Sequence, residues 1–187
     1  RWQVGGILNL VSGAPMNFTS MTRSFNQYPN MSSPIPRPVS MVGSIPRSFG
    51  EVKRDDIGVS YFEGLTSVQD PSVASLTTEQ NLRQGSLMQA VAAGGQLIAV
   101  NPTPGTIGNM GIGYLEGPGL VRFDVNLVKR IRISEGTEFE FRADAIDVLN
   151  RTNFAAPDTN INSTTFGRIT EANGGNRIIV LNARISF

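Results

Sequence analysis

The sequence predicts an all-β protein, an antiparallel transmembrane β-barrel fragment that comprises the last four strands and one long extracellular loop. Three observations lead to this fold class. Four segments alternate between apolar and polar residues, the connections between them run long, short and long, and aromatic residues fall near one end of the strands. The predicted strands cover about residues 1–12, 120–133, 137–149 and 177–187, and the long loop covers about residues 16–118.

Composition excludes several classes of function before any pattern is considered. The chain has 187 residues, a formal net charge of +1, and neither Cys nor His. Zinc sites of the usual kind, disulfide frameworks, thiol nucleophiles and Ser-His-Asp triads are therefore excluded, and we expect no cofactor. The near-neutral charge argues against nucleic acid as a partner. No apolar run approaches the roughly 20 residues of a spanning helix, although barrel strands give a much weaker hydropathy signal.

The first two predicted strands alternate with a period of two residues. In the first, one face carries Trp2, Val4, Gly6, Leu8 and Leu10. In the second, the apolar face carries Val121, Phe123, Val125, Leu127, Ile131 and Ile133, and the polar face carries Arg122, Asp124, Asn126, Arg130 and Arg132. Two residues break this pattern, because Lys129 falls on the apolar face and Val128 on the polar face. The period indicates strands that meet a different environment on each side.

The last two predicted strands follow the same pattern. In the third, Phe139, Phe141, Ala143 and Ala145 alternate with Glu138, Glu140, Arg142 and Asp144. Its phase slips near Ile146 to Leu149, which indicates either a β-bulge or the end of the strand. In the fourth, Ile179, Leu181, Ala183, Ile185 and Phe187 alternate with residues that include Arg184.

Alternation alone also describes the half-buried strands of a soluble β-sandwich, so the connections and the aromatic residues carry the distinction. The second and third strands are joined by a short turn, Ser134-Glu135-Gly136, whereas both flanking connections are long. Outer-membrane barrels have short periplasmic turns and longer extracellular loops. If this turn is periplasmic, the aromatic residues near the periplasmic ends form an interfacial girdle, and these are Trp2, Phe139, Phe141 and Phe187.

In that orientation the polar face lines a wet lumen. The lumen-facing residues would be Arg122, Asp124, Asn126, Arg130, Arg132, Glu138, Glu140, Arg142, Asp144 and Arg184. For each of these charges we favour a structural or solvating role over substrate binding, since most charged residues simply face water.

The turn also predicts a strand register. Apolar residues oppose apolar ones only if the turn has an odd number of residues, which a three-residue turn with Gly136 in the left-handed conformation provides. Arg132 then lies opposite Glu138, and Arg130 lies opposite Glu140. Each of these opposite-charge pairs is expected to stabilise the sheet by about 0.2–1 kcal/mol. Lys129 either extends its side chain towards the periplasmic side or is turned inward by a bulge.

The long stretch between the first two strands is rich in Pro, Gly, Ser and Asn over much of its length. One part of it, residues 77–93, lacks Pro and places Leu82, Leu87, Met88 and Val91 roughly on one helical face. We therefore expect a helix there.

Several short motifs resemble the last strands of TonB-dependent receptors, and most closely the carboxypeptidase-regulatory-like group. The matching segments are residues 1–4 leading to 12–15, 101–109, 117–127, 141–154 and 160–169. The resemblance covers both ends of the chain and thins out between Phe18 and about Ile98. The terminal Phe187 resembles the signal that the barrel-assembly machinery reads, although Ile185 stands where that signal often has a second aromatic residue.

The resemblance implies a bacterial outer-membrane location and a role in active uptake of a substrate that the sequence does not identify. It implies a barrel of about 22 strands with a plugged lumen, and the implied partners are outer-membrane lipid, TonB through an N-terminal region, and the barrel-assembly machinery. Because the chain starts at Arg1 inside an alternating pattern, without an initiator Met or signal peptide, we expect it to be a fragment of a longer protein.

Two other classes of protein remain open at this stage. One is a passive outer-membrane porin without a plug. The other is a soluble glycan-binding β-sandwich with Trp2 and Tyr114 as stacking residues, which explains the loop lengths and the terminal Phe poorly. An enzyme is not expected, because Arg130, Arg132 and Arg142 surround the only suggestive carboxylate pair, Glu138 and Glu140.

Overall fold

The computed structural model describes residues 1–20, 37–75, 77–78, 88–103 and 106–187. It divides into two compact units. The first comprises Arg1–Ser12, Gly119–Ala155 and Glu171–Phe187, and we call it the sheet unit. The second comprises Gly13–Pro118 and Ala156–Thr170, and we call it the loop unit.

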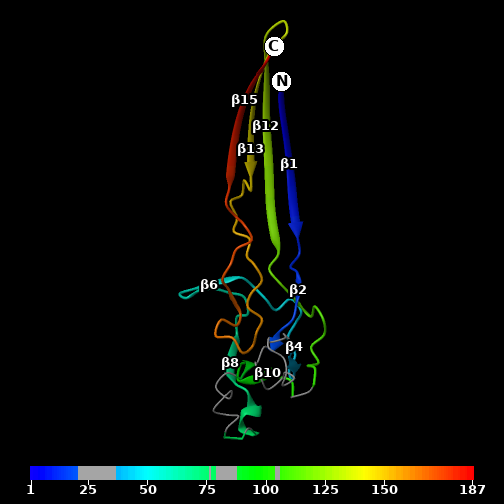
Figure 1. Ribbon diagram of the computed structural model, residues 1–187, viewed down its shortest axis with the longest axis vertical. Helices are drawn as coiled ribbons and strands as arrows, with labels where there is room; N and C mark the ends of the chain where they lie inside the picture. The colour runs from blue at the N-terminus through cyan, green and yellow to red at the C-terminus, as the bar shows by residue number, and fades with distance from the viewer. Residues whose placement is uncertain (21–36, 76, 79–87, 104–105) are drawn as a thin grey trace. The chain divides into compact units, whose positions relative to one another are not determined.

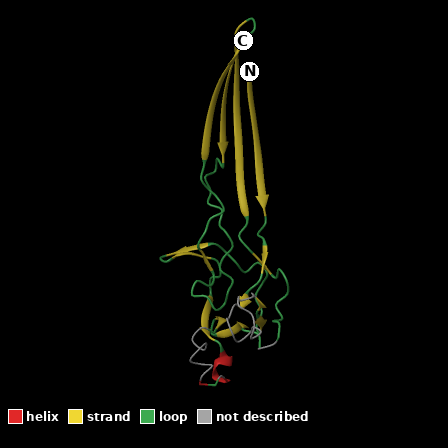
Figure 2. Ribbon diagram, in the orientation of Figure 1, coloured by secondary structure: helices red, strands yellow, loops and turns green. Residues whose placement is uncertain are grey.

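The sheet unit is built from four long antiparallel strands that run side by side (Figures 1 and 2). They are β1 (Trp2–Val11), β12 (Leu120–Ser134), β13 (Thr137–Ile146) and β15 (Ile178–Ser186), in the order β1-β12-β13-β15. Both chain termini lie at the same end of this sheet as the turn between β12 and β13 (Figure 1). The outer edges of β1 and β15 carry no partner strand within the sheet unit.

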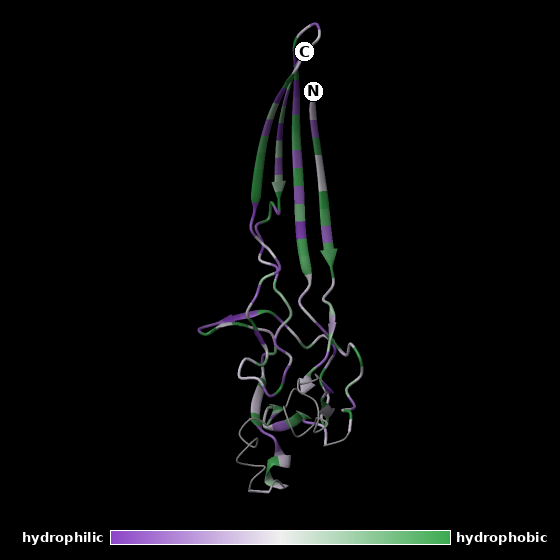
Figure 3. Cartoon of the chain, viewed as in Figure 1, coloured by the Kyte–Doolittle hydropathy of each residue, from purple (hydrophilic) through white to green (hydrophobic). Residues whose placement is uncertain are grey.

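The register brings like residues together across the sheet. Leu8 lies opposite Phe123, and Leu127 lies opposite Val4 on one side and Ala143 on the other. Polar residues pair in the same way, as Asn9 does with Arg122. Figure 3 shows the resulting alternation of hydrophilic and hydrophobic residues along β12. One face of the sheet is therefore apolar and the other polar.

The turn between β12 and β13 sets this register. Ser134 pairs with Thr137, the register shifts between Arg132 and Ser134, and Gly136 adopts a φ of 89°. Glycine reaches that left-handed conformation without steric cost. The expected pairs follow, because Arg132 lies opposite Glu138 and Arg130 opposite Glu140.

The third strand is shorter than the sequence indicates. The prediction extended it to about residue 149, but β13 ends at Ile146 because the next residue, Asp147, turns the backbone to a φ of 50°. The Asp147 amide donates a hydrogen bond to Asp124 Oδ1 at 2.8 Å instead of continuing the ladder. The phase slip in the sequence therefore marks the end of the strand.

The loop unit contains several small antiparallel sheets. The largest described sheet has the order β5-β10-β9-β8, formed by Ser40–Met41, Gln96–Val100, Gln89–Ala93 and Leu65–Gln69. A second has the order β14-β7-β6, formed by Arg168–Ile169, Gly58–Ser60 and Lys53–Asp55. Two strand pairs complete it: β2 (Pro15–Met16) with β11 (Leu115–Glu116), and β3 (Thr19–Ser20) with β4 (Arg37–Pro38). A short 3-10 helix, η1, spans Pro71–Ser75.

The helix expected over residues 77–93 is wrong over its last five residues, and residues 79–87 lie outside the described part of the chain. Gln89–Ala93 forms strand β9, which pairs with β8 and β10, and Met88 and Val91 are buried. Leu82 and Leu87 lie outside the described residues. Pairing on both sides of β9 outweighs the weak helical spacing of its apolar residues. No helix in the described residues is long and apolar enough to cross a membrane.

An aromatic cluster forms the centre of the loop unit. Phe18 is fully buried, and its ring contacts those of Phe62 and Phe166 edge-on at centroid distances of 4.9 and 5.2 Å. These residues come from separate segments of the chain. The long connection is therefore a folded unit with its own core, in the part that the structure describes.

A buried polar network joins further segments of the loop unit. The Asp70 carboxylate, 2% exposed, accepts hydrogen bonds from the Ser72 amide and hydroxyl and from the Asn101 amide and Nδ2. Asn101 Oδ1 accepts in turn from Ser20 Oγ and Asn162 Nδ2, at 2.6 and 2.7 Å. These donors compensate for burying the carboxylate and fix the segments relative to one another.

Candidate functional site

The polar face of the sheet is the candidate site. The register places every predicted lumen-facing residue on this one face: Arg122, Asp124, Asn126, Arg130 and Arg132 on β12, Glu138, Glu140, Arg142 and Asp144 on β13, and Arg184 on β15. Across from β12, the same face receives Gln3, Gly5, Ile7 and Asn9 of β1. Sequence periodicity alone was enough to group these residues, because side chains alternate strictly along a strand.

Ion pairs link the charges of this face along and across the strands. Arg130 Nε lies 2.6 Å from Glu140 Oε2 and 3.7 Å from Glu138 Oε1. Along single strands, Arg122 pairs with Asp124 at 3.0 Å and Arg142 with Asp144 at 2.8 Å. Arg132 lies opposite Glu138, yet the ion pair of Glu138 forms diagonally with Arg130. Since these side chains are exposed to solvent, each pair contributes little to stability, and the face is close to neutral.

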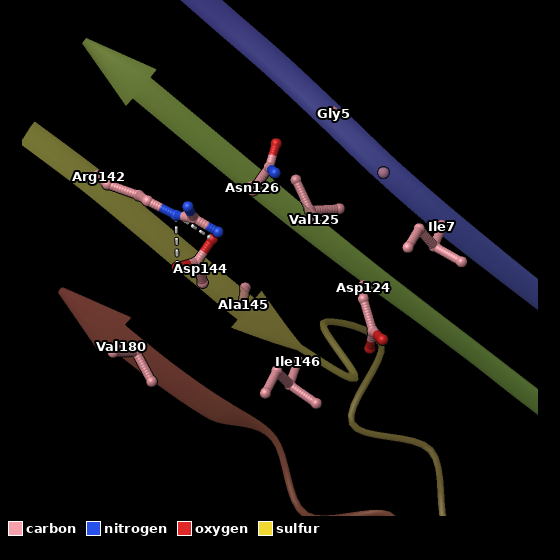
Figure 4. Close-up of a pocket in the computed structure, with 11 residues that line it drawn as sticks. Gly5, Ile7, Asp124, Val125, Asn126, Arg142, Asp144, Ala145, Ile146 and Val180 are labelled. Carbon is pink, nitrogen blue, oxygen red and sulfur yellow. Dashed lines mark hydrogen bonds and ion pairs between the residues drawn. The ribbon is translucent and has the colours of Figure 1, made fainter. Parts of the chain in front are cut away.

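A recess of about 360 Å³ lies on this face near the end of β13 at Ile146 and the start of β15 (Figure 4). It is lined by polar side chains of β12 and β13 and by apolar ones at its sides, which are Asp124, Asn126, Arg142 and Asp144, and Ile7, Ile146 and Val180. Gly5 helps to create it, because a Cβ at this position would lie 2.6 Å from Asn126 Oδ1. The recess is open on one side and offers both hydrogen-bond donors and acceptors.

Two residues near this recess hold buried acceptors that have no hydrogen-bond partner. They are Asn126, through Oδ1, and Asp147, through both carboxylate oxygens. Asp147 is 4% exposed, and its backbone is attached to Asp124 by the hydrogen bond described above. A buried unpartnered acceptor costs about 1–3 kcal/mol. Sequence reasoning did not select Asp147, because it lies where the alternation slips and its position on a face was undefined.

The apolar face carries three of the predicted girdle aromatics. Trp2 and Phe141 lie on either side of Lys129 in one row across the sheet, and Phe139 lies in the next row, opposite Ile131 and Ile185. Phe187 follows the end of β15 and is 99% exposed. Lys129 is in phase with the apolar residues, with no bulge at its position, so the inward-turned alternative for this side chain is wrong. Its ammonium lies 4.3 Å from the centroid of the Trp2 ring.

Several other apolar side chains of this face are exposed. Val4, Leu10 and Leu181 have exposed fractions of 71%, 67% and 65%. A contiguous apolar surface of this kind is rarely left in water by a soluble monomer. The sheet therefore needs an apolar environment on one side and a polar one on the other.

Among the described residues, no group of three or more His, Cys, Asp or Glu side chains is placed to hold a metal ion. In a comparison with protein families, the family described as the outer membrane beta barrel domain matches residues 1–180 of the chain. No curated protein and no solved structure matches the chain significantly.

Proposed function

The chain belongs to the outer membrane β-barrel family and resides in the bacterial outer membrane, and on this premise we propose that it is the C-terminal wall segment of a TonB-dependent transporter. Its apolar face contacts lipid, and its polar face lines the lumen. The loop unit forms the long extracellular connection and takes part in substrate capture.

The separation of the two faces is the observation that carries this proposal. The interior of a barrel of about eight strands is filled by its own side chains, whereas wider barrels hold water or a plug domain. The four strands here present partly exposed Arg, Asp and Glu side chains along most of one face. Such a face suits a wide barrel, and the two outer strand edges would pair with further strands of the parent protein.

A plug rather than an open channel is favoured by the resemblance of residues 141–154 and 160–169 to TonB-dependent receptors, which have a plugged lumen. TonB, outer-membrane lipid and the barrel-assembly machinery are accordingly the proposed partners.

We do not propose a catalytic role or a nucleic-acid partner. Glu138 and Glu140, the carboxylates with a suggestive spacing, both lie within ion-pairing distance of Arg130. Because the Arg130 guanidinium engages both carboxylates, neither is free to act on a substrate.

Sequencing the DNA upstream of the Arg1 codon tests the proposal. A TonB-dependent transporter requires further alternating strands, a plug domain and a segment that contacts TonB. A frame with strands but no plug would overturn the transporter in favour of a porin. A reading frame with neither further strands nor a plug would contradict both the transporter and the porin.

A further inference from the structure

Lys129 is the one charged residue on the apolar face of the sheet unit. Its partners in the register are Trp2 on β1 and Phe141 on β13. The ammonium lies over the indole ring of Trp2 at 4.3 Å from its centroid, a geometry in which the ring attracts the cation. The side chain is thus held among aromatic residues on the side that faces lipid.

The position of Lys129 along the strand decides what surrounds its ammonium. Between Val121 and Leu127, every residue of β12 on this face is apolar, and Lys129 follows eight residues after Val121. At about 3.4 Å per residue this distance is ~27 Å along the strand, or about 19–22 Å across the membrane for a tilt of 35–45°. The apolar band of an outer-membrane barrel is about 25 Å tall. With Val121 at the loop-side boundary of the band, Lys129 lies near the opposite boundary, and the apolar row of Ile131, Phe139 and Ile185 continues into the interfacial region.

The neighbouring strands place the boundary at the same row. On the side of Lys129 that leads to the loops, the next row of paired residues across the sheet is apolar and contains Val4, Leu127, Ala143 and Leu181. The row after it contains Gly6, Val125, Ala145 and Ile179. Aromatic rings gather beside Lys129, where an interfacial girdle is expected. A Lys at the midplane of the bilayer would cost about 2–4 kcal/mol, whereas at the interface its flexible stem lets the ammonium reach the headgroups.

We propose that Lys129 binds the phosphate of a phospholipid headgroup, with the Trp2 ring as a positioning residue that holds the ammonium at the membrane boundary. The lipid phosphate supplies the negative charge that the apolar face lacks. No other charged side chain of the sheet unit shares this face, and the acyl chains would cover the adjacent Leu127, Val4 and Leu181. The proposal rests on the outer-membrane location and applies equally to a transporter and to a porin.

Lipid binding to the full-length purified protein tests this site. In a maltoside detergent, phosphatidylglycerol is titrated and the lipid-bound fraction is measured by native mass spectrometry, with diacylglycerol as the matched lipid that has no phosphate. We expect Lys129→Met to lower the affinity for phosphatidylglycerol about fivefold, which corresponds to the ~1 kcal/mol contributed by one Lys near an anionic surface. Lys129→Arg should retain binding.

Two further variants separate this site from general effects of charge and folding. Arg184→Met removes the same charge from the polar face and should leave lipid binding unchanged. Trp2→Leu keeps the ammonium but removes the ring, and should weaken binding by a smaller factor than Lys129→Met. The proposal is overturned if Lys129→Met and wild type retain phosphatidylglycerol equally, or if diacylglycerol binds as well as phosphatidylglycerol. Neither result bears on the plug or on TonB, so the transporter proposal is tested separately.

Discussion

The sheet unit exposes many of its apolar side chains, whereas the loop unit buries an apolar core of its own. In the sheet unit, Trp2 and Leu8 are 62% and 56% exposed, whereas in the loop unit Phe18 and Ile161 are completely buried. The loop unit also surrounds its buried carboxylate, Asp70, with hydrogen-bond donors. The loop unit is thus organised as water-soluble domains are, around its own core, while the sheet unit presents its apolar residues to an external apolar medium.

The largest expected difference between the two units concerns access of water to neighbouring residues of β1. Leu8 lies on the apolar face opposite Phe123, and Asn9 lies on the polar face opposite Arg122. In the cysteine-free background of this chain, Leu8→Cys should resist a water-soluble maleimide in intact outer membranes, whereas Asn9→Cys should be labelled. After denaturation both positions should react, which shows that both thiols are present. Equal labelling of both positions in intact membranes would contradict the assignment of the faces.

The core of the loop unit should show the next largest effect. Phe18 is fully buried against Phe62 and Phe166, so Phe18→Ala should destabilise the unit by about 3–5 kcal/mol. Protease cleavage within the loop unit at increasing urea concentration, with the barrel intact, measures this loss. Leu8→Ala in the sheet unit is the control and should leave that cleavage unchanged. A similar shift for both variants would mean that the two units do not unfold separately.

Removing the buried carboxylate of the loop unit should have a somewhat smaller effect. Asp70→Ala leaves the Asn101 amide and the Ser72 amide without their acceptor, and we expect a loss of about 2–3 kcal/mol. The same cleavage assay measures it. Asp56→Ala provides the control, because Asp56 is exposed. If Asp70→Ala were as mild as Asp56→Ala, the network would contribute little to stability.

The sheet unit was largely predictable from the sequence, for a physical reason. Side chains of a strand alternate, so the faces of β12 and β13 could be read directly, and the turn with Gly136 then determined which residues lie opposite one another. The diagonal ion pair between Glu138 and Arg130 was not predictable, because it depends on side-chain conformations that the register leaves open. The end of β13 was uncertain for a similar reason, since Asp147 adopts its positive φ in a local tertiary setting.

The loop unit was not predictable in this way. Its core joins Phe18, Phe62 and Phe166, which are far apart in the sequence and belong to no periodic pattern. Strand β9 was mistaken for part of a helix because apolar residues at irregular spacing fit either structure, and only the pairing with β8 and β10 distinguishes them. Long-range contacts of this kind leave no short-range signal in the sequence.

The smallest expected effect concerns an ion pair on the surface of the loop unit. Arg168 Nη1 lies 2.7 Å from both carboxylate oxygens of Asp55, and the Ile57 and Gly58 amides also donate to Asp55 Oδ1. The Arg168 guanidinium is the main reason that the pKa of Asp55 is lowered from its ordinary value of 3.8, and the Ile57 amide adds to the shift. The Arg168–Asp55 pair connects the β6–β7 hairpin to β14, whereas the amide hydrogen bonds to Asp55 lie within the hairpin.

A lowered folded-state pKa means that the pair stabilises the loop unit above the ordinary pKa of an aspartate, and that this contribution is lost as the pH falls through the lowered value. Because the pair is exposed, we expect a small effect that high salt reduces further. Proteolytic stability of the loop unit between pH 7 and pH 3 measures it, and Asp55→Asn should flatten this part of the pH dependence while Asp56→Asn should not. An unchanged profile in Asp55→Asn would show that other carboxylates govern the acid sensitivity of the unit.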